Sequence, residues 1–135
     1  MPLINLKKTR LNNEDDDIVL YRTFHENNGR YLEREGEPEK FKVLWNIDDS
    51  SPSVFKSNQD INMLMQDIEV VLNEAHSQND NEMCNHLKEI FVLCKLCLWN
   101  NGMFYLEFTP WGVKLDSYPS NLPDKFKFNI SNIDN

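Results

Sequence analysis

The period of the hydrophobic pattern changes twice along the chain. Between Ile18 and Phe24 the residues are mainly β-branched and aromatic, and an acidic run precedes them while a polar turn follows at 25–29. This composition predicts a strand that enters a hairpin. The returning strand is expected at 30–34, which ends in a turn around Gly36 and Pro38.

A second alternating run follows at 41–47. Phe41, Val43, Trp45 and Ile47 are separated by single residues, so an extended backbone would place all four on one face. The first third of the chain therefore predicts a three-stranded meander.

After residue 53 the period lengthens to that of a helix. Ser57 and Asp60 have the spacing of a capping box, with Asp in place of Glu. They predict a helix over about residues 58–76, in which the apolar positions are Ile61, Leu64, Ile68, Val71, Leu72 and Ala75. A polar break at 77–81 precedes a second helix that should end near Gly102. Two helices joined by so short a loop are expected to lie antiparallel.

Alternation returns after Gly102. It is visible in 103–108, then around 111–115, and finally in 125–130. The sequence thus predicts an α+β fold in one domain, 1–135, with an antiparallel sheet of about five to six strands. In this order, βββ-αα-βββ, the helix pair packs on one face of the sheet and the other face is wet.

All three cysteines lie in the second predicted helix, and Cys94 and Cys97 form a C-x-x-C pair. With about 100° of rotation per residue, both fall in the apolar stripe of that helix. A zinc site would need further ligands from distant segments. A redox pair would need a helix N-terminus, whereas this pair lies in the last turns. We therefore interpret these cysteines as core residues and predict neither a metal nor a cofactor.

Charge narrows the class of partner. The net charge is −8, from 22 acidic and 14 basic side chains, which argues against nucleic acid as a ligand and favours a basic protein. The simpler alternative is that the charge keeps the protein soluble. No stretch is long and apolar enough for an export signal or a membrane span, and an odd number of clustered cysteines is typical of a reducing compartment. These features predict a cytoplasmic protein.

Candidate partner-binding residues form two acidic groups. The first consists of Glu14, Asp15, Asp16 and Asp17 with the turn residues Glu33, Glu35, Glu37 and Glu39, which a meander would bring to one end of the sheet. The second consists of Asp60, Asp67 and Glu74, which recur every seven residues on the face of the first helix away from its apolar stripe, with Met63 and Val70 between them. Exposed apolar side chains that are rimmed by charge are typical of interfaces, although a solvated helix face would show the same pattern.

No catalytic motif accompanies these residues. The G-x-S-x-G and glycine-rich phosphate patterns are absent from the sequence. In size, acidity and lack of a catalytic motif, the chain is similar to the immunity proteins that neutralise basic toxins, nuclease toxins among them. The sequence therefore predicts a non-catalytic toxin inhibitor that docks to its target. Two alternatives stay open: a secretion chaperone or other adaptor, and a small enzyme whose site is assembled from residues such as Tyr21, His25, Glu33 and Trp45.

Overall fold

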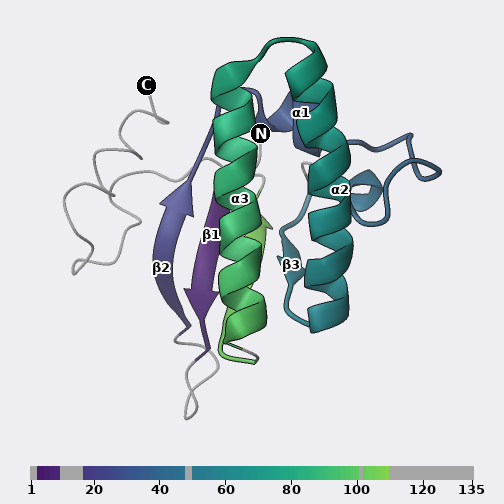
Figure 1. Cartoon of the computed structure of the whole chain (residues 1–135). Helices are drawn as coiled ribbons and strands as arrows, with labels where there is room; N and C mark the ends of the chain where they lie inside the picture. Colours follow the sequence, from purple (N-terminus) through teal and green to yellow (C-terminus); the bar gives the residue numbers. More distant parts are fainter. Residues whose placement is uncertain (1–2, 10–16, 48–49, 101, 110–135) are drawn as a thin grey trace.

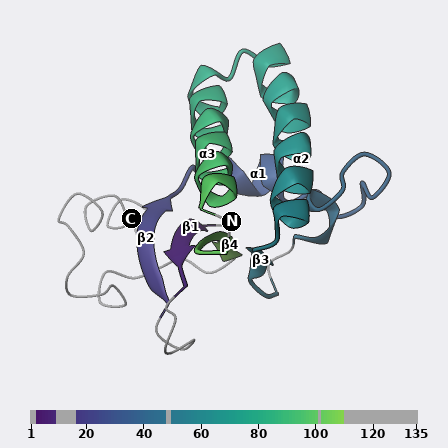
Figure 2. The same cartoon turned by 60° about the horizontal axis from the view of Figure 1, so that its bottom comes forward.

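The computed structural model describes residues 3–9, 17–47, 50–100 and 102–109. It has an α+β architecture, in which two long helices cover one face of a four-stranded antiparallel sheet (Figures 1 and 2). Along the chain the elements are β1 (Leu3–Lys8), β2 (Ile18–Thr23), α1 (Asn28–Leu32), the 3₁₀ helix η2 (Leu44–Asn46), β3 (Ser53–Phe55), α2 (Asn58–Ser77), α3 (Asn81–Trp99) and β4 (Phe104–Thr109).

The strand order is β2-β1-β4-β3, so the first and last described strands lie side by side in the middle of the sheet. In the β1–β4 register Ile4 pairs with Phe108 and Leu6 with Leu106. These four side chains are at most 4% exposed and belong to the core beneath the helices. The strand β1, which pairs with two others, is not among the predicted strands.

The face of the sheet opposite the helices is not the wet face that the alternation predicts. Asn5 and Tyr105 on that face are only 3% and 5% exposed. A polar ladder crosses three strands there: Arg22 Nε donates to Asn5 Oδ1 at 2.9 Å, and Asn5 Nδ2 donates to Glu107 Oε1 at 3.1 Å. Lys7 completes the ladder with an ion pair to Glu107 at 3.7 Å. Buried polar groups are tolerated when they have hydrogen-bond partners, and this ladder supplies them.

The helix predictions are confirmed. Ser57 Oγ accepts the N–H of Asp60 at 3.0 Å and caps α2, while Asp80 Oδ1 accepts the N–H of Met83 at 3.1 Å and caps α3. Gly102 follows α3 with φ of +83°, a conformation that favours glycine. The two helices form an antiparallel hairpin (Figure 1).

The meander prediction is wrong beyond its first strand, β2. The segment expected as a returning strand at 30–34 overlaps helix α1, and the run expected as a strand at 41–47 contains η2. Phe41, Leu44 and Ile47 are at most 2% exposed, whereas Trp45 is 40% exposed. The buried positions recur every three residues, as a 3₁₀-like turn requires, rather than every two.

Two predicted strands, at 111–115 and 125–130, lie outside the described residues, as do Glu14, Asp15 and Asp16. The predicted total of five to six strands and the order βββ-αα-βββ are not confirmed. Among the described helices, none combines the length and apolar character needed to cross a lipid bilayer.

Candidate functional site

The segment from α1 to η2, residues 28–46, packs along one side of α2, and we call it the anchored segment. Buried and half-buried acids of α2 hold it there. Asp67, which is 2% exposed, accepts backbone N–H groups from three consecutive residues. The Lys42 N–H reaches both carboxylate oxygens at 2.9 and 3.0 Å, while the N–H groups of Val43 and Leu44 reach Oδ2 at 2.7 and 3.0 Å. The prediction that Asp67 lies on the helix face away from the apolar stripe is therefore wrong, because its carboxylate is enclosed and accepts these bonds.

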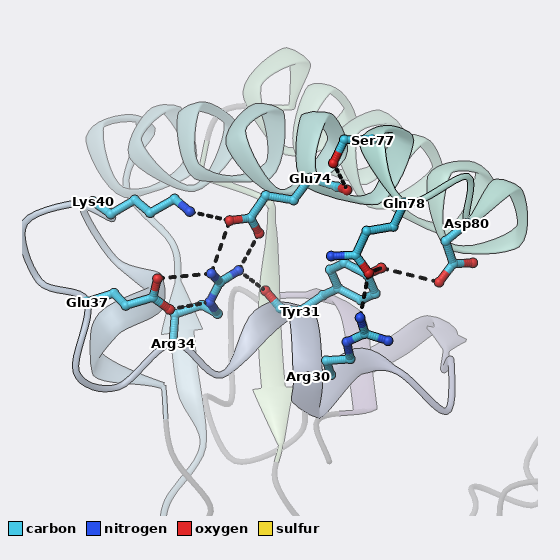
Figure 3. Close-up of polar contacts among 9 residues, drawn as sticks. All are labelled: Arg30, Tyr31, Arg34, Glu37, Lys40, Glu74, Ser77, Gln78 and Asp80. Atoms are coloured by element: carbon cyan, nitrogen blue, oxygen red, sulfur yellow. Dashed lines mark hydrogen bonds and ion pairs between the residues drawn. The ribbon is translucent and has the colours of Figure 1, made fainter.

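Glu74, two turns further along α2, holds the same segment (Figure 3). Its carboxylate accepts from Arg34 Nη1 at 2.5 Å and Nη2 at 3.1 Å, and it also pairs with Lys40. Arg34 Nε and Nη2 donate to Glu37 at 2.5 and 3.0 Å. One guanidinium thus joins two carboxylates in the fork geometry that makes arginine pairs strong. The hydrogen bonds from Arg34 lower the pKa of Glu74 and of Glu37.

A second group of contacts fixes α1 to the junction between α2 and α3 (Figure 3). Tyr31 Oη donates to Gln78 Oε1 at 3.2 Å and lies 3.4 Å from Asp80 Oδ2, while Arg30 also donates to Gln78. The hollow between these elements measures about 420 Å³. Because the charged groups around Arg34 neutralise one another, we assign this hollow a structural role.

The anchored segment presents one large aromatic side chain to solvent. Trp45 lies on η2, directly after the backbone that Asp67 binds, and its indole N–H donates to the carbonyl of Lys42 at 3.1 Å. Val54 on β3 is 49% exposed. Both line a hollow of about 360 Å³ with Pro52, the cation Lys42 and the carboxylate of Asp60. We call these five residues the Trp45 surface.

The Trp45 surface adjoins an open edge of the sheet. β3 pairs only with β4, and residues 53–55 make no further backbone hydrogen bond to the described parts of the chain. An unpaired edge leaves backbone donors and acceptors for another chain. An exposed tryptophan beside such an edge, with its indole N–H bonded to the backbone, has the features of a binding hot spot.

The other predicted acids fall into different environments. Asp17 accepts a hydrogen bond from Tyr105 Oη, and Glu33 is half-buried. Glu35 and Glu39 are exposed on the anchored segment. Residues 14–16 lie outside the described ranges, so the contact between this acidic run and the turn at 35–39 stays a prediction.

The two apolar residues predicted with the second acidic group are only partly exposed. Met63 is half-buried, and Val70 packs against the core. Of the three predicted acids on α2, only Asp60, which is also half-buried, belongs to the Trp45 surface.

Two residues of the alternative enzyme site, Tyr21 and His25, contact side chains three residues apart on α3. Tyr21 Oη donates to Glu89 on α3 at 3.0 Å, and burial together with that carboxylate raises the pKa of Tyr21 to about 12. The His25 ring lies 5.4 Å from that of His86. Trp45, by contrast, lies on η2, on the far side of α2 from α3 (Figure 1). These contacts therefore do not bring Trp45 together with Tyr21 and His25 (Figure 1).

The cysteines occupy the core, as predicted. All three thiols are free and buried, and burial raises the pKa of Cys94 to about 12 and that of Cys97 to about 11. Within the described ranges, no three His, Cys, Asp or Glu side chains come together as metal ligands.

Comparison with known proteins adds nothing to this geometry: no family model, no curated protein and no solved structure matches the chain.

The positions of the three α2 acids on the helix predict their contacts with the anchored segment. On a helical wheel Asp60, Asp67 and Glu74 lie only about 40–80° from Leu64, which is in the apolar stripe. They therefore flank the stripe instead of opposing it, and such a position predicts contact with a neighbouring segment.

Proposed function

We propose that the protein is a non-catalytic binding protein that docks a basic protein through the Trp45 surface. The observation that carries this proposal is an exposed tryptophan on a hydrogen-bonded backbone. A buried carboxylate accepts the N–H groups of the three residues before Trp45, yet Trp45 itself is 40% exposed. Exposed tryptophans with a fixed orientation lose little entropy on binding and commonly dominate interface energies.

The charge supports a basic partner. The chain carries a net charge of −8, and Glu35 and Glu39 are exposed on the same anchored segment. A lysine or arginine of the partner could lie over the Trp45 ring and approach Asp60. The long-range acidic field would accelerate association with a cationic cleft.

Within this proposal, the class of partner that fits best is a basic toxin, with this chain as its immunity protein in the cytoplasm. Such an inhibitor needs no catalytic group of its own, only a surface that covers the cationic site of its target.

Affinity capture from the source cell tests the proposal, with wild-type protein, Trp45→Ala and Trp99→Ala as baits. Trp99 is an exposed tryptophan at the end of α3, so its replacement is a matched control. We expect a basic protein that the wild type and Trp99→Ala retain and that Trp45→Ala loses. Its purified complex should weaken as salt rises. A Trp45-dependent partner that is acidic, a Trp45-dependent complex that ignores salt, or equal capture of the basic protein by Trp45→Ala would contradict the proposal.

A further inference from the structure

The outward side of α3 carries large apolar side chains that are exposed. Val92 is 56% exposed and Trp99 is 74% exposed, although Leu87, Ile90 and Cys94 on the same helix are fully buried. Val92 and Trp99 are seven residues apart, so they lie within about 20° of each other on the helix and about 10.5 Å apart along it. They form an exposed apolar line over two turns.

Two lysines follow the same repeat. Lys88 is exposed and Lys95 is half-buried, and on the wheel they lie about 40° and 60° from Val92, on the same side of it. The Lys95 ammonium lies 5.6 Å from the centre of the Phe91 ring. Neither lysine forms an ion pair with any carboxylate in the described ranges. In a chain of net charge −8, this side of α3 is therefore a local cationic edge beside an apolar line. We call Lys88, Val92, Lys95 and Trp99 the α3 seam.

We infer that the α3 seam docks an amphipathic helix of a partner protein whose carboxylates lie two turns apart beside its apolar stripe. Charge complementarity selects this occupant, because each lysine then gains a carboxylate while Val92 and Trp99 are removed from water. Helices commonly recognise one another through anchors at this spacing.

Two other occupants fit less well. An anionic bilayer would repel a chain of net charge −8. A second copy joined seam to seam with the two α3 helices antiparallel would bring lysines near lysines, since the two-fold axis then places both lysine edges on the same side of the contact.

The α3 seam is separate from the Trp45 surface, because η2 and α3 lie on opposite sides of α2 (Figure 1). The two surfaces also differ in the charge of the partner that they favour. One chain could thus hold a basic protein at one surface and an acidic helix at the other.

The test uses two synthetic helical peptides of about 20 residues, a length at which isolated helices form in water. Both carry leucines at i, i+3, i+4 and i+7; one has glutamates beside this stripe, and the other has lysines there. Fluorescence polarisation at low salt should show that the full chain binds the glutamate peptide at least about tenfold more tightly than the lysine peptide, a ratio that corresponds to about 1.4 kcal/mol.

Three variants test which side chains of the protein bind the glutamate peptide. Lys88→Glu combined with Lys95→Glu should reverse the preference, and Val92→Ser combined with Trp99→Ser should weaken the glutamate peptide about tenfold or more. Trp45→Ala should bind the glutamate peptide as tightly as the wild type does, because Trp45 is not part of the α3 seam. Circular dichroism verifies that each variant is folded, as the exposure of the replaced residues leads us to expect.

Several outcomes would overturn the inference. The first is that both peptides bind equally well or that neither binds. The second is that the double variant of Lys88 and Lys95 still prefers the glutamate peptide. Sedimentation that shows a dimer dissolved by Trp99→Ser would assign the seam to a second copy instead. Binding to vesicles of anionic phospholipid that requires Trp99 would assign it to a membrane.

Discussion

The carboxylate of Asp67 and the backbone of Leu44 meet inside the protein, where the Leu44 N–H donates to Asp67 Oδ2 at 3.0 Å. Twenty-three residues separate the two in sequence. The contact belongs to a set in which one buried side chain satisfies three consecutive N–H groups that no strand or helix pairs. A single acid thus determines the path of the chain into η2 and the position of Trp45.

Replacing Asp67 by Asn tests this relationship with almost no change in size. An amide has one acceptor oxygen in place of two, and its NH₂ group would face backbone donors. We expect the free energy of unfolding to fall by about 2–4 kcal/mol, since buried donors lose a charged partner. Urea unfolding followed by circular dichroism measures the loss.

The control is Glu69→Gln, two residues further along the same helix. Glu69 is exposed, so the same loss of charge should change stability by less than about 0.5 kcal/mol. Equal stability of the two variants would mean that Asp67 does not hold the η2 segment.

A second prediction concerns the geometry of the Arg34 pair. The Arg34 side chain is 13% exposed and pairs with Glu74, whose side chain is 22% exposed. Arg34→Lys keeps the charge but cannot bind two carboxylates through a planar fork, so we expect a loss of about 1–2 kcal/mol. Arg30→Lys, which makes the same replacement at an exposed position of α1, should cost much less.

A double-mutant cycle with Arg34→Met and Glu74→Gln separates this pair from its surroundings. We expect a coupling energy of about 1 kcal/mol that high salt reduces only in part, because both groups are largely enclosed. Additive losses of unfolding free energy in the two single variants would show that Arg34 and Glu74 do not stabilise the protein as a pair.

Local signals allowed the sequence to predict the helices. The α2 and α3 caps lie within three residues of the groups that they satisfy, and the apolar spacing extends over five turns. The same is true of β2 and β4, where the composition of six residues suffices.

The segment 41–47 could not be predicted in the same way. Phe41, Val43, Trp45 and Ile47 fit a period of two, while Phe41, Leu44 and Ile47 fit a period of three, so the pattern supports both backbones. The hydrogen bonds to Asp67, which are distant in sequence, favour the second. The strand β1 was not predicted although Ile4 and Leu6 alternate with Asn5 and Lys7. The burial of Asn5 could not be predicted locally, because it depends on a ladder that forms only in the sheet.

His86 predicts a dependence of stability on pH. It is 7% exposed, its Nε2 lies 2.8 Å from Asn28 Oδ1, and burial with the nearby His25 lowers its pKa to about 4. Between about pH 6.5 and pH 4 the unfolded chain therefore binds a proton that the folded chain does not, so stability falls as the pH decreases through this range and then levels off. The slope contributed by His86 is at most about 1.4 kcal/mol per pH unit.

Urea unfolding between pH 5 and pH 6.5 isolates this effect. The pKa values of Glu37 and Glu74 are lowered in the folded protein, so the stability that these two groups contribute is lost mainly at lower pH. His86→Gln should flatten the slope in this window, and His76→Gln, at an exposed position of α2, should leave it unchanged. A slope that persists in His86→Gln would assign the dependence to another group.

The last prediction returns to the C-x-x-C pair. Cys94 is 0% and Cys97 3% exposed, and their raised pKa values leave almost no thiolate at neutral pH. A thiol reagent should therefore label the native protein very slowly and label all three cysteines in urea. Replacing both Cys94 and Cys97 by Ala should cost about 1–3 kcal/mol through lost packing. It should leave the Trp45-dependent partner bound, because neither thiol contributes to that surface. Rapid labelling of the native pair, or loss of binding in a double variant that circular dichroism shows to be folded, would mean that the cysteines have a role beyond the core.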